Sequence, residues 1–160
     1  MNHKILLLLF IGQFILTALS GQCVLSEKKS EIQINDSILL TADISCVSKD
    51  SLHFEKVKTF DSFLISDNEL VFGTDGEVPI TKLDKLRLIV KGKNIDLETS
   101  SMYNPNGKSL DIRKSQFDIS LLSPEVYILK GVFSDGAGTY IAEWLIVQDV
   151  SVRIKLGLIE

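Results

Sequence analysis

The last part of the chain, residues 126–158, contains three apolar runs separated by two short polar breaks. The runs are rich in β-branched and aromatic residues, and the breaks (Ser134–Gly138 and Gln148–Asp149) have the composition of turns. This pattern predicts a three-stranded antiparallel meander. Shorter runs with turn signals between them precede it, so the sequence predicts an all-β fold, either an antiparallel sandwich or a small barrel.

The lengths of the two breaks predict how the three strands pair. A four-residue loop over Asp135–Gly138 would place Lys130 opposite Glu143 on the neighbouring strand. A two-residue turn at Gln148–Asp149 would place Glu143 opposite Ile154. Glu143 is therefore expected in the middle strand, with a cross-strand neighbour on each side.

Side chains alternate between the two faces of a strand, so the meander is expected to have two faces of different composition. The first face is expected to carry Ile141, Leu145, Val147, Val150, Val152 and Ile154 around Glu143. The second face is expected to carry Tyr140, Ala142, Trp144 and Ile146 beside Ser151, Arg153 and Lys155. The middle strand is apolar on both faces and is predicted to lie inside the sheet. The last strand is apolar on one face only, which predicts that its polar side faces water.

The beginning of the chain has the pattern of a cleavable signal peptide over residues 1–20. A lysine precedes the apolar segment 5–16, and Ala18 and Ser20 are the small residues of a cleavage site. The alternative is a retained membrane anchor, although the apolar segment is short for a spanning helix. Residues 21–160 are expected to form a single all-β domain outside the cytoplasm (periplasmic, secreted or associated with the cell envelope) without a transmembrane span.

The two cysteines that follow the leader, Cys23 and Cys46, are expected to form a disulfide, because an exported protein meets an oxidising compartment. The alternative is lipidation of Cys23, as in bacterial lipoproteins. The residue before a lipidated cysteine is usually small, whereas here it is Gln22. The disulfide would tie the start of the mature chain to the first sizeable strand, at residues 37–46. Between them, residues 26–36 are predicted to form a short helix or an irregular arm.

The chain is mildly acidic, with a formal net charge of −4. This balance argues against nucleic acid as a partner and against an anionic membrane surface, since both need a basic footprint. Carboxylates between Asp61 and Glu77 could offer oxygen ligands to calcium, but their spacing does not fit an EF-hand loop. Paired cysteines would leave no thiol for a His/Cys metal site. The sequence therefore predicts no metal site and no cofactor.

Glu143 is the residue that stands out as a candidate for function, because it interrupts a strand whose other positions are apolar. A buried carboxylate needs a partner, and the predicted register supplies Lys130. We expect a largely buried structural ion pair between the two side chains. The alternative is that Glu143 and Lys130 belong to a ligand-binding site, or that Glu143 is a catalytic carboxylate.

The sequence leaves three classes of function open. The first is a non-catalytic binding or scaffold domain for a protein or small-molecule ligand, since the sequence shows no catalytic constellation; a closed barrel with an apolar cavity would indicate a small-ligand carrier. The second is an inhibitor or immunity-type protein that caps another protein, which a flat exposed apolar patch would favour. The third is a carboxylate-dependent hydrolase, which needs two facing carboxylates in a cleft.

Overall fold

The computed structural model of the chain describes residues 27–48, 53–57 and 60–159. The predicted signal peptide, its cleavage site and Cys23 lie outside these residues. Within the part of the chain that is described, no helix is long and apolar enough to cross a membrane.

The described residues form three open β-sheets, and every pair of neighbouring strands in them is antiparallel. The strands are β1 (Glu27–Asn35), β2 (Ile38–Cys46), β3 (Glu55–Val57), β4 (Phe60–Ser66), β5 (Glu69–Val71), β6 (Thr81–Val90), β7 (Lys93–Leu97), β8 (Pro105–Lys108), β9 (Phe117–Ser123), β10 (Val126–Phe133), β11 (Tyr140–Val147) and β12 (Val150–Leu158). Two short 3₁₀ helices are η1 (Lys114–Gln116) and η2 (Gly136–Gly138). The strand orders are β1-β2-β6-β7, β12-β11-β10-β9 and β3-β4-β5. The prediction of an antiparallel all-β fold is confirmed.

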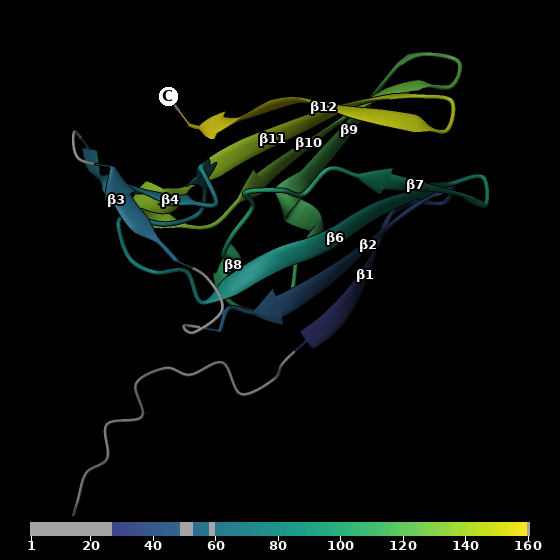
Figure 1. The fold of residues 1–160 in the computed structure, drawn as a ribbon. Coiled ribbons are helices and arrows are strands. Elements are labelled where there is room, and N and C mark those ends of the chain that lie inside the picture. The colour runs from purple at the N-terminus through teal and green to yellow at the C-terminus, as the bar shows by residue number, and fades with distance from the viewer. Residues whose placement is uncertain (1–26, 49–52, 58–59, 160) are drawn as a thin grey trace, which may run out of the picture.

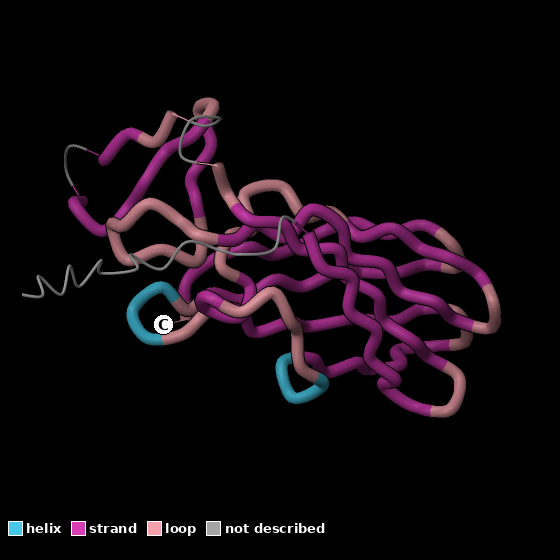
Figure 2. Tube along the Cα trace, turned by 90° about the horizontal axis from the view of Figure 1, so that it is seen from below, coloured by secondary structure: helices cyan, strands magenta, loops and turns pink. Residues whose placement is uncertain are grey.

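The two four-stranded sheets face each other across one hydrophobic core (Figure 1). Leu40 and Leu88 enter this core from the first sheet, and Leu129, Phe133 and Trp144 enter it from the second. Figure 2 shows the small sheet β3-β4-β5 at the end of the molecule opposite the β6–β7 and β11–β12 turns. None of the three sheets closes on itself, so the arrangement corresponds to the sandwich alternative and not to the barrel.

The N-terminal arm is a strand, which corrects the expectation of a short helix or an irregular segment over residues 26–36. β1 pairs with β2 along its length and forms one edge of the first sheet. Within β1 only Ser30 and Ile32 are buried, and the remaining residues are half-buried or exposed. An edge strand with one wet side can be mostly polar, and its pairing depends on a partner strand rather than on its own composition.

Aromatic side chains fill the centre of the core. Trp144, Tyr140 and Phe133 are all fully buried. The rings of Phe133 and Tyr140 stack with centroids 5.3 Å apart, and Phe133 meets Trp144 edge-to-face at 6.2 Å. Each polar atom has a partner: Trp144 Nε1 donates to the carbonyl of Glu98 (3.0 Å), and the Tyr140 hydroxyl donates to the carbonyl of Tyr103 (3.2 Å). Burial raises the pKa of the Tyr140 phenol well above its usual value.

Asn104 joins the first sheet to the loop that follows β5. Its side-chain oxygen accepts hydrogen bonds from the amides of Ile80 (2.9 Å) and Thr81 (3.0 Å), and its side-chain nitrogen donates to the carbonyl of Gly73 (2.9 Å). Gly73 has a φ of +91°, and a Cβ there would lie 1.9 Å from the carbonyl oxygen of Tyr103. Glycine is therefore required at this junction for both its conformation and its small size.

The predicted pairing of the first two meander strands is confirmed. Lys130 on β10 lies opposite Glu143 on β11. The predicted turn between β11 and β12 is also correct at its start, since Leu145 lies opposite Val152. β11 has a neighbour on each side, as its two apolar faces indicated.

The predicted pairing of the last strand is wrong beyond a bulge. The register of β12 shifts between Arg153 and Lys155, so Lys155 rather than Ile154 lies opposite Glu143. An extra residue in one strand moves the following side chains to the other face. Lys155 therefore shares a face with Glu143, and not with Trp144 as the sequence suggested.

β12 directs its polar side toward the opposite sheet, which corrects the expectation that this side faces water. Arg153 Nη1 donates to the carbonyl of Ser100 (2.7 Å) and Nη2 donates to its hydroxyl (3.1 Å). The hydroxyl of Ser151 donates to the carbonyl of Asp96 (2.5 Å). These acceptors belong to β7, the edge strand of the first sheet, and to the segment that follows it. Edge strands carry polar backbone groups that need donors from elsewhere, and β12 supplies them.

We expect Gly73→Ala to lower the free energy of unfolding by about 3 kcal/mol or more, because the added methyl group would overlap backbone atoms. Gly92→Ala is the matched control: Gly92 also has a positive φ (+78°), but a Cβ there meets nothing within 4 Å. Its cost should be only about 1–2 kcal/mol, for the left-handed conformation. Urea unfolding curves measure both values, and equal losses would contradict the close packing at Gly73.

The disulfide between Cys23 and Cys46 stays a prediction, because Cys23 lies outside the described residues. Cys46 ends β2, and no cysteine among the described residues is free. Peptide mapping without reductant should find the two cysteines linked, and reduction should lower the free energy of unfolding by about 3 kcal/mol. A variant with serine at both positions should not respond to reductant. Two thiols that alkylate rapidly in native protein, or a lipid on Cys23, would overturn the pairing.

Candidate interaction surface

The side of the β9–β12 sheet that faces away from the core is here called the outer face (Figure 1). Leu129 and Trp144 are buried on the inner side, so the alternation of side chains assigns their neighbours to the outer side. The outer face includes Asp118, Ser120 and Ser123 on β9, Val126, Ile128, Lys130 and Val132 on β10, Ile141, Glu143, Leu145 and Val147 on β11, and Val150, Val152, Ile154 and Lys155 on β12.

Most of the outer face is apolar, and part of it is strongly exposed. The exposed fractions of Val150, Val152, Ile154 and Val147 are 62, 58, 51 and 44 %. Val147 lies directly opposite Val150, so these side chains are contiguous. Isolated exposed apolar residues are ordinary on protein surfaces, whereas a contiguous group of them is typical of an interaction surface.

A row of charged residues crosses the outer face from one edge strand to the other. Asp118 lies opposite Lys130, Lys130 lies opposite Glu143, and Glu143 lies opposite Lys155. Cross-strand neighbours point to the same side of a sheet, so the four charges alternate in sign along one line. Asp118 and Lys155 are exposed, and the two central residues are half-buried.

The expected ion pair between Lys130 and Glu143 is only partly correct. The two residues do lie opposite each other, but both are half-buried instead of largely buried. The two ion pairs formed by the described residues lie elsewhere, so no salt bridge joins these side chains. The physical reason is that no further layer of the described chain covers the outer face, and water can solvate both charges.

The sequence signals missed two members of the charged row. Asp118 lies in one of the shorter runs before the meander, and composition does not show which strand is the neighbour of this run in the sheet. Alternation from the turn predicts Lys155 on the opposite face, because nothing in the sequence marks the bulge that lies opposite Glu143 and Trp144. Alternation of side chains would have found both residues if the register had been known.

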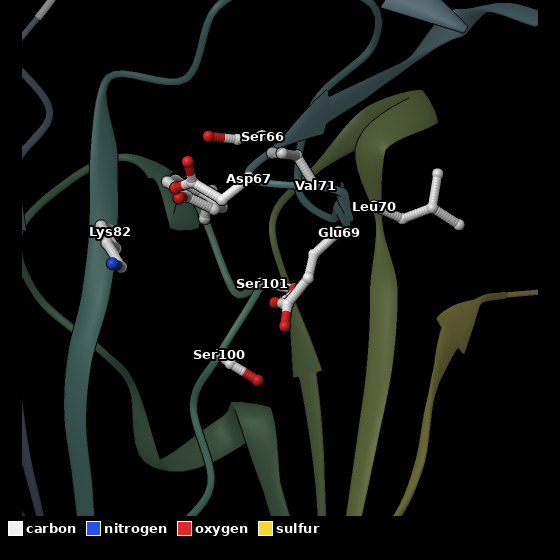
Figure 3. Close-up of a pocket in the computed structure, with 9 residues that line it drawn as sticks. Ser66, Asp67, Glu69, Leu70, Val71, Lys82, Ser100 and Ser101 are labelled. Carbon is white, nitrogen blue, oxygen red and sulfur yellow. Dashed lines mark hydrogen bonds between the residues drawn. The ribbon is translucent and has the colours of Figure 1, made fainter. Parts of the chain in front are cut away.

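A second candidate site is a hollow of about 110 Å³ beside the β4–β5 hairpin (Figure 3). Asp67 and Glu69 extend from the hairpin, and Lys82 of β6 lies across from them. Glu69 Oε2 accepts a hydrogen bond from the hydroxyl of Ser101 at 2.7 Å. The hollow is smaller than the roughly 300 Å³ at which small-molecule pockets begin, so it suits water molecules or an ion.

Two further polar groups line this hollow. The hydroxyl of Ser66 is buried and has no hydrogen-bond partner within the described part of the chain. Burial, and then the neighbouring carboxylates of Asp67 and Glu69, raise the pKa of the Tyr103 phenol above its usual value. The phenol is neutral at physiological pH, so it can donate a hydrogen bond to a bound oxygen atom.

A larger hollow of about 500 Å³ lies between three loops at the end of the sandwich near the small sheet. Asp75, Glu77 and Asp135 line it together with one cation, Lys108. Its volume is within the range of ligand pockets, and its excess of carboxylates would favour a cationic molecule. Backbone atoms of the loops form much of its wall, including the 3₁₀ helix η2.

The carboxylates that the sequence placed in one segment divide between these two hollows. Asp67 and Glu69 line the smaller hollow, whereas Asp75 and Glu77 line the larger one. Among the residues that the structure describes, no group of three histidine, cysteine or acidic residues is placed to hold a metal ion. The side chain of Asp61 lies outside what the structure describes.

Comparison of the chain with models of protein families, with curated proteins and with solved structures found no match. The function must therefore be argued from the surfaces of this molecule.

We expect the variant Val150→Thr/Val152→Thr to change the free energy of unfolding by no more than about 0.5 kcal/mol, because both side chains are exposed and threonine keeps the β-branched shape. Leu129→Ala, on the buried side of the same sheet, should cost about 2–5 kcal/mol. Urea unfolding at low protein concentration measures both. A large loss in the double variant would show that the outer face belongs to the core of the monomer.

Proposed function

We propose that this protein is an exported, non-catalytic binding domain that docks a protein on the outer face of the β9–β12 sheet. The inhibitor or immunity-type protein predicted from the sequence is one form of this function, in which docking caps the partner. Export rests on the signal-peptide pattern of residues 1–20.

The observation that carries the proposal is the orientation of β12. Its polar residues Ser151 and Arg153 bind backbone carbonyls of β7 and of the segment that follows it, while its apolar residues Val150, Val152 and Ile154 point to solvent. Burying apolar surface yields about 25 cal/mol per Å², so a contiguous exposed group favours association with another surface.

The geometry supports a small-ligand carrier and a carboxylate-dependent hydrolase less well. A small-ligand carrier built as a closed barrel needs a closed sheet, and the sheets here are open. A glycosidase-type hydrolase needs a second carboxylate facing the first. The cross-strand neighbours of Glu143 are Lys130 and Lys155, so its nearest charged neighbours in the register are cations.

Photo-crosslinking in the protein's own host compartment tests the proposal. A photoreactive residue at Val152 should give a discrete crosslink to a polypeptide, because this position lies on the outer face. The matched control is Asn94 on β7, which is also exposed but belongs to the other sheet. Crosslinks of equal yield at the two positions, or none at Val152, would count against the proposal. Intact mass of the native protein tests export, and a retained Met1 would contradict it.

A further inference from the structure

We propose that the partner of the outer face is the same face of a second copy of this chain, in a symmetric dimer with its two-fold axis parallel to the strands and between β10 and β11. This inference rests on the proposed function and names its partner. Two observations carry it: the order of charges in the charged row, and the apolar rows beside it.

The charged row is complementary to its own reverse. Across the strands from β9 to β12 its signs are negative, positive, negative, positive, from Asp118, Lys130, Glu143 and Lys155. A two-fold axis along the strands reverses this order in the second copy. Lys130 of one copy then faces Glu143 of the other, and Asp118 faces Lys155. Each of the four charged side chains then faces a side chain of opposite charge, and such complementarity favours association in this register.

The apolar residues of the two central strands, β10 and β11, match under the same operation. Ile128 lies opposite Leu145 in the row next to the charges, and Val132 lies opposite Ile141 in the row on the other side. The two-fold axis between β10 and β11 exchanges the members of each row. Ile128 of one copy therefore meets Leu145 of the other, so apolar side chains face apolar side chains on the two central strands. On the edge strands of the same row, Val152 of β12 meets Ser120 of β9.

The charges also select one orientation of the two copies. A two-fold axis perpendicular to the strands would place each charged residue opposite itself, for example Lys130 on Lys130. Facing like charges repel each other strongly where water is excluded, so this alternative is disfavoured. The selected arrangement keeps the strands of the two copies nearly aligned, as in most packed pairs of sheets.

The size of the outer face predicts a reversible dimer. The two central strands have eight residues each, and strands about 4.8 Å apart with about 3.3 Å per residue give roughly 500 Å² in projection for four strands. Two such faces together bury roughly 1,000 Å², which is near the lower limit for a specific interface.

Sedimentation of charge-reversal variants tests the proposal. Lys130→Glu in both copies would place two carboxylates against each other, and Glu143→Lys in both copies would place two ammonium groups against each other. Each variant alone should therefore dimerise at least about tenfold more weakly than the wild-type protein. In an equimolar mixture of the two variants, the heterodimer places opposite charges against each other at both of these contacts.

Mixing the two variants restores the contact that each of them disrupts. In the heterodimer of Lys130→Glu with Glu143→Lys, the two substituted side chains face each other as a carboxylate and an ammonium group. The two unsubstituted side chains, Glu143 of the first variant and Lys130 of the second, also face each other with opposite charges. The heterodimer should thus form within about threefold of the wild-type affinity.

A second pair of variants uses exposed positions on the edge strands, where folding is least affected. Asp118→Lys and Lys155→Glu should each weaken the dimer and restore it when mixed. Lys93→Glu is the matched control, because this exposed lysine lies on β7 of the other sheet and should leave the dimer unchanged. Circular dichroism checks that every variant is folded.

Weakening of each single variant together with rescue by mixing indicates the proposed two-fold arrangement. A second chain does not correct an effect on monomer folding. A two-fold axis perpendicular to the strands would leave the single variants no weaker than the wild type, because like charges already face each other in that arrangement. Wild-type protein that stays monomeric up to its solubility limit would overturn the dimer. A dimer whose variants are not rescued by mixing, as expected for edge-to-edge pairing of β12, would overturn this interface. If the wild type is monomeric but Val152 crosslinks to a different protein, self-association fails and the proposed function stands. If the wild type is monomeric and Val152 gives no crosslink, both the dimer and the proposed function are contradicted.

Discussion

The burial of Trp144 determines the orientation of every side chain in the β9–β12 sheet. Its ring lies at the centre of the core, and its Nε1 has a hydrogen-bond acceptor in the segment that follows β7. These contacts determine which side of β11 faces the core. Side chains alternate along a strand and share a face across the register, so this one orientation passes to β10, β9 and β12. The outer face exists because Trp144 is inside.

Either side of β11 could have faced the core, and the free energies of burial explain which side does. Trp144 and Tyr140 bury about 150–250 Å² each, worth roughly 4–6 kcal/mol apiece at about 25 cal/mol per Å². The other side offers smaller aliphatic residues and Glu143, whose charge would lose its hydration on burial. β12 must follow β11, and its Ser151 and Arg153 fit the inner side because they bond to backbone carbonyls at the edge of the first sheet.

The outer face combines two features that a freely monomeric surface does not need. Its exposed valines favour association, while the charged row restricts which surface can approach and in which orientation. With one symmetry operation, the proposed dimer pairs every charge of the row with its opposite and covers the apolar residues of β10 and β11. The exposed charges at Asp118 and Lys155 also discourage unspecific pairing of the edge strands β9 and β12 with other chains.

The sequence by itself determined the local structure of this protein: an antiparallel all-β fold, the meander over residues 126–158, and the pairing of Lys130 with Glu143. These features follow from alternation and turn length, which are encoded over a few neighbouring residues. The tertiary structure alone decided which face of the meander is buried, and it placed β1 as an edge strand, the bulge before Lys155, and Asp118 beside Lys130. Each of these depends on strands distant in the sequence, because facing sheets, not neighbouring residues, decide which side of a strand loses its water.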